Sequence, residues 1–413
     1  MAGDLSGGAA RGAFWLHKAL VRLGVNSQIL INSADEQADD RLTNINARTG
    51  RRVWQGLSNR LSELPTRLHF IDTQHQHFDN GLGGSLYKRC RAFQDADLVH
   101  LHHINGAVSV KSLRTINKPM VWTLRSMWPL TGGCHYSFDC TRYQSGCSSC
   151  PQLGPQLPFD LARRNARIKR ASYPAQLQFV GVSDWISESA RASALLARFP
   201  IRTIHNGIDT TEFSPIDQRA AKASLHLRAD TRYLLVVAQN FRNRHKGFSV
   251  LCDALSHLNP SGLHLLIVGN TSQEQVARLR FPHTLLGKVT DTESLRAIYS
   301  ASSVFVAPNL METFGKTVVE AMACGTPAAC FDSTGPGEIV EHKVSGYRAR
   351  SFDPRALAEG IQWLLDLPAQ AGFDLATQAR ARAVEHFDTM ISGRKYLNLY
   401  QSILGLNHRA PGQ

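Results

Sequence analysis

Short apolar runs alternate with longer amphipathic stretches along most of the 413-residue chain. Short runs rich in β-branched residues are typical of buried parallel strands, and apolar residues three and four apart are typical of the helices that cover them. The alternation therefore predicts an α/β fold with parallel sheets. The expected strands are 25–31, 98–101, 120–124 and 178–182 in the first half, and 233–238, 263–268, 284–286, 304–307 and 328–331 in the second.

A turn-rich segment separates these two sets of strands. Residues 204–209 read Ile-His-Asn-Gly-Ile-Asp, and Pro215 follows them. Asn-Gly favours a turn and proline discourages a continuing helix. The chain is also too long for one typical domain. We expect a doubly wound domain over 1–203, a second over 204–384, and a C-terminal helix and tail over 385–413 that crosses back to the first domain.

The start of the chain predicts a glycine loop followed by a helix. Gly7 and Gly8 precede a stretch with a single apolar face, and Gly24 is its expected stop. A doubly wound domain begins with a central strand, yet residues 1–5 are not strand-forming. We therefore expect the native protein to begin upstream of Met1, with an apolar segment of roughly five to eight residues there.

Residues 304–327 are the most informative segment. The expected strand 304–307 leads through a loop holding Glu312 into a helix that carries Thr317 and Glu320 and stops at Gly325. The N-terminus of a helix that follows a parallel strand binds phosphate through its free N–H groups and its dipole. Glu320 lies one turn beyond Thr317, where a carboxylate accepts hydrogen bonds from a ribose. The alternative is that both glutamates are merely solvated.

This segment resembles the sugar-nucleotide motif of retaining family 4 glycosyltransferases with the GT-B fold, in which seven residues separate two glutamates. Glu312 and Glu320 have that spacing. Further matches follow in the family's order along nearly the whole chain: Ser6-Gly7-Gly8, Trp122-Thr123-Leu124, residues 206–209, Lys246-Gly247, and Gly287 before Tyr299.

The resemblance implies a GT-B fold, two Rossmann-like domains that face a central cleft, and it assigns roles to several residues. Glu312 and the backbone of Thr313, Phe314 and Gly315 would hold the donor sugar. Thr317 would bind the diphosphate and Glu320 the ribose, and the loop at Gly7 and Gly8 would border the diphosphate and the acceptor.

Residues 239–247 supply the expected cations for a leaving diphosphate. Lys246 matches the family pattern, whereas the usual Gly-Arg pair is absent, so Arg242 and Arg244 are both candidates. Cations beside a helix N-terminus stabilise the charge that develops as a glycosidic bond breaks. Without the family context, a solvated basic loop explains this segment equally well.

Residues 122–136 resemble the colanic-acid and exopolysaccharide branch of the family. A histidine often stands there in the place of Arg125 and contacts the donor sugar. An arginine cannot act as a base near neutral pH, so contact with an anionic acceptor is the expected use of Arg125. His102 and His103, just after the expected strand 98–101, are further candidates on the acceptor side. Their alternative is a polar loop at a strand end.

Four of the eight cysteines fall within residues 134–150, an insert on the first domain. Cys134, Cys140, Cys147 and Cys150 are separated by five, six and two residues. Disulfides are rare in a cytoplasmic chain, and clustered thiols that include Cys-x-x-Cys favour tetrahedral zinc. We expect a structural zinc, with His135 able to replace one cysteine; disulfides and free thiols are the alternatives.

The net charge of +13 lies mostly in the first half of the chain. Lys and Arg outnumber Asp and Glu by 24 to 14 in residues 1–200 and by 22 to 19 in residues 201–413. A basic face attracts anionic lipids or anionic substrates. No nucleic-acid-binding motif accompanies the charge, so we expect no nucleic-acid partner. With no apolar run of membrane-spanning length and no signal-peptide pattern, we expect a cytoplasmic protein, peripheral on the anionic inner membrane surface.

These features together predict a hexosyltransferase. It would move a hexose from a nucleoside diphosphate sugar to a lipid-linked or polysaccharide acceptor, with retention and with no catalytic metal, in cell-surface or exopolysaccharide biosynthesis. Retention and substrate class follow from the resemblance. The rivals are a sugar-nucleotide epimerase on the same scaffold and a non-catalytic sugar-nucleotide-binding assembly partner.

Overall fold

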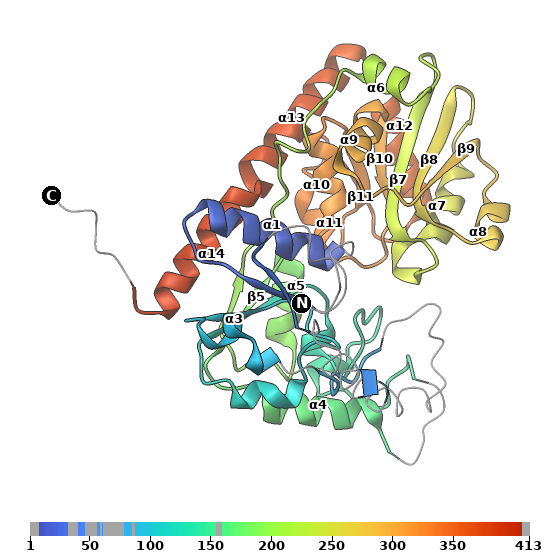
Figure 1. Cartoon of the computed structure of the whole chain (residues 1–413). Helices are drawn as coiled ribbons and strands as arrows, with labels where there is room; N and C mark the ends of the chain where they lie inside the picture. Colours follow the sequence, from blue (N-terminus) through green and yellow to red (C-terminus); the bar gives the residue numbers. More distant parts are fainter. Residues whose placement is uncertain are drawn as a thin grey trace. The chain divides into compact units, whose positions relative to one another are not determined.

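A computed structural model describes residues 8–31, 40–45, 56–57, 60, 78–84, 87–153 and 159–406. The chain forms two compact units (Figure 1). The first comprises Met1–His205 together with Ser392–Gln413, and the second comprises Asn206–Ile391. Gly7 lies outside the described residues, so only Gly8 of the glycine pair is placed.

The second unit is built on six parallel strands in the order β12-β11-β10-β7-β8-β9. They are β7 (Arg232–Asn240), β8 (Leu263–Asn270), β9 (His283–Gly287), β10 (Val304–Ala307), β11 (Ala328–Phe331) and β12 (Gly346–Ala349). Apolar side chains of β7, β8 and β10 form much of the buried core. The first five strands were predicted within a few residues. β12 was missed because its sequence, Gly-Tyr-Arg-Ala, is not an apolar run.

Helices of the second unit fall into two groups. α7 (Phe248–Leu255) packs with α12 (Pro354–Leu365), and α10 (Lys316–Ala323) packs with α9 (Thr292–Ala301) and α13 (Ala369–Phe387). The remaining helices are α6 (Gln218–Ser224), α8 (Gln273–Arg278) and α11 (Thr334–Ile339). Parallel strands with crossover helices give the doubly wound arrangement that the apolar pattern predicted.

In the first unit, four parallel strands form one sheet in the order β3-β4-β5-β6. They are β3 (Val99–Leu101), β4 (Met120–Leu124), β5 (Leu177–Gly181) and β6 (Ile201–Thr203). A separate parallel pair joins β1 (Ile29–Ile31) to β2 (Leu42–Asn44). β1 begins four residues later than the predicted strand 25–31. β2 and β6 were not predicted, because each is three residues long and carries polar side chains.

The first unit includes the helices α1 (Gly8–Arg22), α3 (Arg91–Gln94), α4 (Leu161–Ser172) and α5 (Asp184–Ala192). α14 (Thr389–Ile403) begins in the second unit, and from Ser392 onward it belongs to the first. Its Tyr396, Leu399 and Tyr400 share a buried core with residues of α1, β4 and β5. Gly393 brings α14 close to α1, since a Cβ there would lie 3.0 Å from the Ala19 Cβ.

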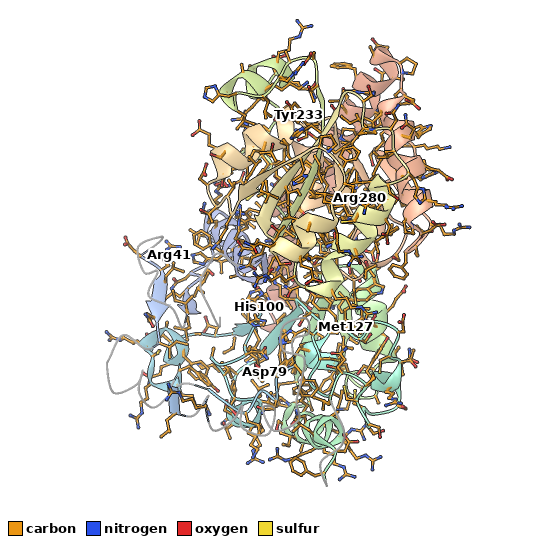
Figure 2. The ribbon with its side chains drawn as sticks, turned by 90° about the vertical axis from the view of Figure 1, so that its right-hand side faces the viewer. Arg41, Asp79, His100, Met127, Tyr233 and Arg280 are labelled. Atoms are coloured by element: carbon orange, nitrogen blue, oxygen red, sulfur yellow. The ribbon has the colours of Figure 1, made fainter. Side chains whose placement is uncertain are left out.

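A large cavity of about 460 Å³ lies inside the first unit. Its walls come from α1, β1, β3, α3 and α14, and most of its lining side chains are apolar, including Leu16, Leu20, Ile29, Leu101 and Leu404. His100, labelled in Figure 2, lines it from β3. The cavity is partly open to solvent, and it leaves these apolar side chains without close packing on one side.

The parallel sheets of the two units confirm the predicted α/β class with two Rossmann-like domains. Among the described residues, no helix is both long enough and apolar enough to cross a membrane.

Candidate functional site

The loop between β10 and α10 is shaped by two glycines in the second unit. Gly315 caps α10 with φ 103°, a left-handed conformation that side chains rarely adopt. A Cβ on Gly335 would lie 2.4 Å from the Phe314 Cα, so only glycine lets the start of α11 approach this loop. Thr317 lies in the first turn of α10, as predicted from the sequence. The N-terminus of a helix that follows a parallel strand is suited to a phosphate.

Lys246 is positioned by a second turn that packs on the same strand end. Gly247 has φ 69°, and a Cβ there would lie 1.8 Å from the carbonyl oxygen of Pro308. The backbone N–H of Leu310 donates to the carbonyl oxygen of His245 at 2.9 Å. These contacts place the 244–247 turn directly against the loop that carries Glu312.

The structure brings Lys246 and Glu312 together. The Lys246 Nζ donates to Glu312 Oε2 at 2.6 Å, and Asn309 Nδ2 approaches the same oxygen at 3.4 Å. The Lys246 side chain is 20% exposed and that of Glu312 is 18% exposed. A partly exposed lysine and carboxylate at the end of a parallel strand can exchange their mutual ion pair for contacts with an anionic ligand and with a sugar hydroxyl.

Glu320 is more buried than the sequence argument anticipated. Its side chain lies on α10, as predicted, but the residue is only 3% exposed, and its Oε2 accepts a hydrogen bond from the Tyr299 hydroxyl at 2.8 Å. The hydrogen bond from Tyr299 on α9 therefore fixes the orientation of the Glu320 carboxylate. The ribose contact of Glu320 stays a prediction.

The remaining predicted donor residues of the second unit differ in exposure. Arg242 and Arg244 are both exposed, so burial does not choose between them. Thr313 and Phe314 are buried, and the Phe314 ring packs edge-on against Phe387 at 5.7 Å. Phe314 therefore serves the core through its side chain, which leaves its backbone as the part suited to a ligand.

Ser333 and Thr334 were not singled out by the sequence. Their hydroxyls are buried, and neither has a hydrogen-bond partner among the residues that the structure describes. Thr334 has φ 57°, and the N–H of the next residue, Gly335, donates to the Glu312 carbonyl oxygen at 3.0 Å. Buried hydroxyls without partners are uncommon and favour an additional ligand contact. The available signal was Ser-Thr-Gly one residue after an apolar strand, with Asp332 between them.

In the first unit, Arg125 and His102 lie together. Arg125 NH2 is 3.3 Å from His102 Nδ1, and a Cβ on Gly12 of α1 would lie 2.4 Å from Arg125 NH1. Burial lowers the pKa of Arg125 to about 10. Burial, with the positive charge of Arg125 and the neighbouring His100, holds the pKa of His102 well below its usual range. This cluster therefore carries its positive charge on Arg125, with the imidazole neutral.

His100 connects this cluster to the C-terminal helix. Its Nε2 is 2.7 Å from Thr123 Oγ1 and its Nδ1 is 2.6 Å from the Tyr400 hydroxyl, while Thr123 Oγ1 also meets the Tyr396 hydroxyl at 2.7 Å. Burial, aided by the charge of Arg125, lowers the pKa of His100 to about 3. His103 instead faces His135, with ring centroids 5.7 Å apart.

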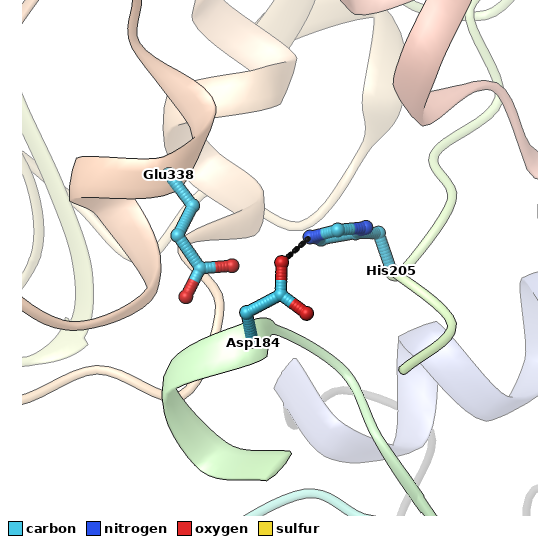
Figure 3. Close-up of side chains that lie close together, drawn as sticks. All are labelled: Asp184, His205 and Glu338. Atoms are coloured by element: carbon cyan, nitrogen blue, oxygen red, sulfur yellow. Dashed lines mark ion pairs between the residues drawn. The ribbon is translucent and has the colours of Figure 1, made fainter. Parts of the chain in front are cut away.

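The first unit also contains two sets of side chains of the kinds that bind metal ions: an aspartate–histidine pair and the four clustered cysteines. Figure 3 shows Asp184 at the start of α5 beside His205, with Oδ2 and Nε2 3.9 Å apart. The four clustered cysteines line a single cavity of about 20 Å³. No three of their sulfur atoms lie within 4.8 Å of one another in this part of the structure.

Comparison with known proteins places the chain in a family. Residues 6–212 match the model described as Glycosyltransferase Family 4, and residues 231–367 match that of Glycosyl transferases group 1. D-inositol 3-phosphate glycosyltransferase 1 of Catenulispora acidiphila is 30% identical over 72% of this chain and 69% of its own length.

Solved structures share the fold across nearly the whole chain. Sucrose-phosphate synthase of Thermosynechococcus elongatus matches with a TM-score of 0.70 and 21% identity, over 97% of this chain and 94% of that protein. Anabaena HepE in complex with UDP-glucose matches with a TM-score of 0.65 and 16% identity, over 97% and 98% of the two chains. The fold is therefore GT-B, and the chain belongs to glycosyltransferase family 4 and is a glycosyltransferase.

Proposed function

We propose that this glycosyltransferase moves a hexose from a nucleoside diphosphate sugar to an anionic acceptor, lipid-linked or polysaccharide, with retention of configuration. The Lys246–Glu312 ion pair beside the start of α10 carries the proposal. A leaving diphosphate needs fixed positive charge, and Lys246 with the N–H groups of α10 supplies it without solvent reorganisation. The complex of HepE with UDP-glucose supports a donor of this class.

Each side chain at the donor site has a distinct role in this proposal. As the diphosphate binds, Lys246 exchanges Glu312 for phosphate oxygens, and Arg242 or Arg244 adds a second cation from the exposed turn. Glu312, released from Lys246, accepts hydrogen bonds from the sugar, while the backbone at Thr313, Phe314 and Gly315 lines it. Thr317 binds the diphosphate. Glu320, held by Tyr299, accepts from the ribose.

In this proposal, the acceptor binds to the basic first unit. Arg125 is a buried cation beside a neutral His102, an arrangement suited to a phosphate or carboxylate on the acceptor. The named acceptor of the Catenulispora relative, D-inositol 3-phosphate, is itself an anion. We place the reaction in cell-surface or exopolysaccharide synthesis, in the cytoplasm at the anionic inner membrane surface, because the excess of positive charge favours such a surface.

A donor screen tests the proposal. The full chain is incubated with a panel of uridine, guanosine and adenosine diphosphate sugars, and release of nucleoside diphosphate is followed with and without inositol phosphate or lipid-linked acceptors. Glu312→Gln is expected to lower turnover while nucleotide affinity changes little. Hydrolysis or transfer from no donor, with nucleotide binding intact, would favour a binding protein. Conversion of the donor sugar to an epimer would favour an epimerase.

A further inference from the structure

Four thiols gather around one small cavity in the first unit, whereas the Lys246–Glu312 pair belongs to the second unit. Cys134, Cys140, Cys147 and Cys150 all line it, and none of them forms a disulfide. The cavity of about 20 Å³ has room for a single small ion or one water molecule. Thiols placed around a space of that size are donors for a soft metal ion.

The backbone around these thiols is arranged to support thiolate sulfur. Gly132 N–H donates to the Cys147 Sγ at 3.1 Å, and the Leu153 N–H donates to the carbonyl oxygen of Cys150 at 3.1 Å. Cys147 has φ 53°, an uncommon left-handed conformation for a residue with a side chain. N–H groups aimed at sulfur stabilise it most when it carries negative charge.

The Cys-x-x-Cys turn is anchored to the rest of the unit by Asp160. Its Oδ2 accepts from the Ser149 N–H at 2.7 Å, while its Oδ1 caps α4 by accepting from the Arg163 N–H at 3.0 Å. A Cβ on Gly132 would lie 2.6 Å from the Ala162 carbonyl oxygen of the same helix. Both sides of the cavity are thus tied to α4.

A buried lysine near the cysteines, Lys169, has no carboxylate partner among the described residues, and burial lowers its pKa to about 7. Lys169 on α4 is 1% exposed, and its ammonium lies 3.6 Å from the centre of the Trp128 ring. The Nζ donates to the carbonyl oxygens of Trp128 and Thr131, the latter at 3.0 Å. No ion pair of Lys169 with a described carboxylate is formed. Burying a charge is costly unless an opposite charge compensates it.

We propose that Cys134, Cys140, Cys147 and Cys150 bind one Zn²⁺ as a closed, structural four-thiolate site, with Lys169 as the nearby countercharge. Each thiol loses its proton to solvent and forms one Zn–S bond. Two positive charges and four thiolates leave a net charge of −2, which the buried ammonium partly offsets. With Zn–S bonds of about 2.3 Å, tetrahedral sulfurs lie roughly 3.8 Å apart, so binding draws the sulfurs inward from their present positions.

Such a site has a structural role. Four protein ligands leave no open position on the metal, so zinc here fixes the 131–153 loop and takes no part in the transfer reaction. The donor site lies in the other unit, so the zinc proposal stands or falls independently of the proposed activity.

The test measures metal in untagged full-length protein after exhaustive dialysis. We expect about one zinc per chain by elemental analysis. Replacement by Co²⁺ is expected to give thiolate-to-cobalt charge-transfer absorption and the visible bands of a tetrahedral site. Cys150→Ser should lose or greatly weaken the metal, whereas Cys252→Ser, at a half-buried thiol of the second unit, should retain one zinc per chain.

Three results would overturn the proposal. One is wild-type protein without zinc that also gives no thiolate–cobalt absorption. Another is an equal metal content in Cys150→Ser and Cys252→Ser. The last is a mass lower by about two or four hydrogens with these thiols unreactive, which means disulfides. If Cys150→Ser fails to fold, the metal content of Cys140→His is measured instead. Histidine also binds zinc, so this variant should keep the metal and show an altered cobalt spectrum.

Discussion

The two units have similar strand orders, but the first unit has one strand more at an edge and no described strand at the centre. In the second unit the order β9-β8-β7-β10-β11-β12 places its first strand, β7, between β8 and β10. In the first unit β2-β1 and β3-β4-β5-β6 form separate sheets, and β1 and β3 both line the 460 Å³ cavity. The cavity thus occupies the position that corresponds to β7. In a doubly wound domain this is the central strand.

The positions of α7 and α1 support the correspondence between β7 and the cavity. α7 follows β7 through the turn at Gly247, and α1 begins at Gly8 beside the cavity. The first unit thus keeps its outer strands, its crossover helices and its polar network, although no described strand joins its two sheets. Lys246, Glu312 and Glu320 belong to the unit whose sheet is continuous.

The largest expected effect comes from filling that central position. Joining an apolar, strand-forming segment of roughly six residues ahead of α1 should raise the free energy of unfolding by more than ~5 kcal/mol. Burying an apolar side chain contributes about 1.5 to 3 kcal/mol, and ordering the added backbone offsets part of this gain. Urea denaturation measures the change. A Gly-Ser segment of equal length is the control, and equal stability of the two extensions would contradict the comparison.

The next largest effect is expected at Gly247, whose turn positions Lys246 against the end of β10. Gly247→Ala should destabilise the second unit by ~3 kcal/mol, because a left-handed backbone and a clash with the Pro308 carbonyl oxygen act together. Gly262→Ala is a matched control: its φ is also 69°, yet a Cβ there meets nothing within 4 Å. It should cost only ~1 kcal/mol. Thermal unfolding that gives the same loss in both variants would show that the packing of this turn is unimportant.

A smaller effect concerns acid sensitivity in the first unit. The pKa of His100 is about 3 in the fold, below the unfolded value of 6.5. Between those values the unfolded chain binds a proton that the fold does not, so stability falls as pH falls. From pH 6.5 to pH 5 the loss due to His100 approaches ~2 kcal/mol. His100→Asn should make the decline shallower by that amount, whereas exposed His257→Asn should leave it unchanged. An identical decline in His100→Asn would refute the role of this buried network.

The sequence predicted most of the sheet architecture, because buried parallel strands such as 120–124 and 304–307 are apolar runs that end at turn residues. It also assigned Lys246 and Glu312 to the same ligand, a nucleoside diphosphate sugar. Contacts between distant residues had no local signal: His100 meets Tyr400, and Glu320 is held by Tyr299 from another helix. The short strands β2, β6 and β12 were missed because three or four partly polar residues do not form a recognisable pattern.

The central claim is that Lys246 and Glu320 bind opposite ends of a nucleoside diphosphate. Measurement of nucleotide affinity tests this claim most directly. Calorimetric titration with UDP, GDP and ADP, and with the corresponding monophosphates, is carried out on the wild type, Lys246→Met, Glu320→Ala and Tyr299→Phe. Lys246→Met should weaken binding of the preferred diphosphate at least ~10-fold, a loss of about 1.4 kcal/mol, and affect the monophosphate much less. Glu320→Ala should weaken both nucleotides by ~1 to 3 kcal/mol, with Tyr299→Phe a milder change. Unchanged diphosphate affinity in both Lys246→Met and Glu320→Ala would contradict the account.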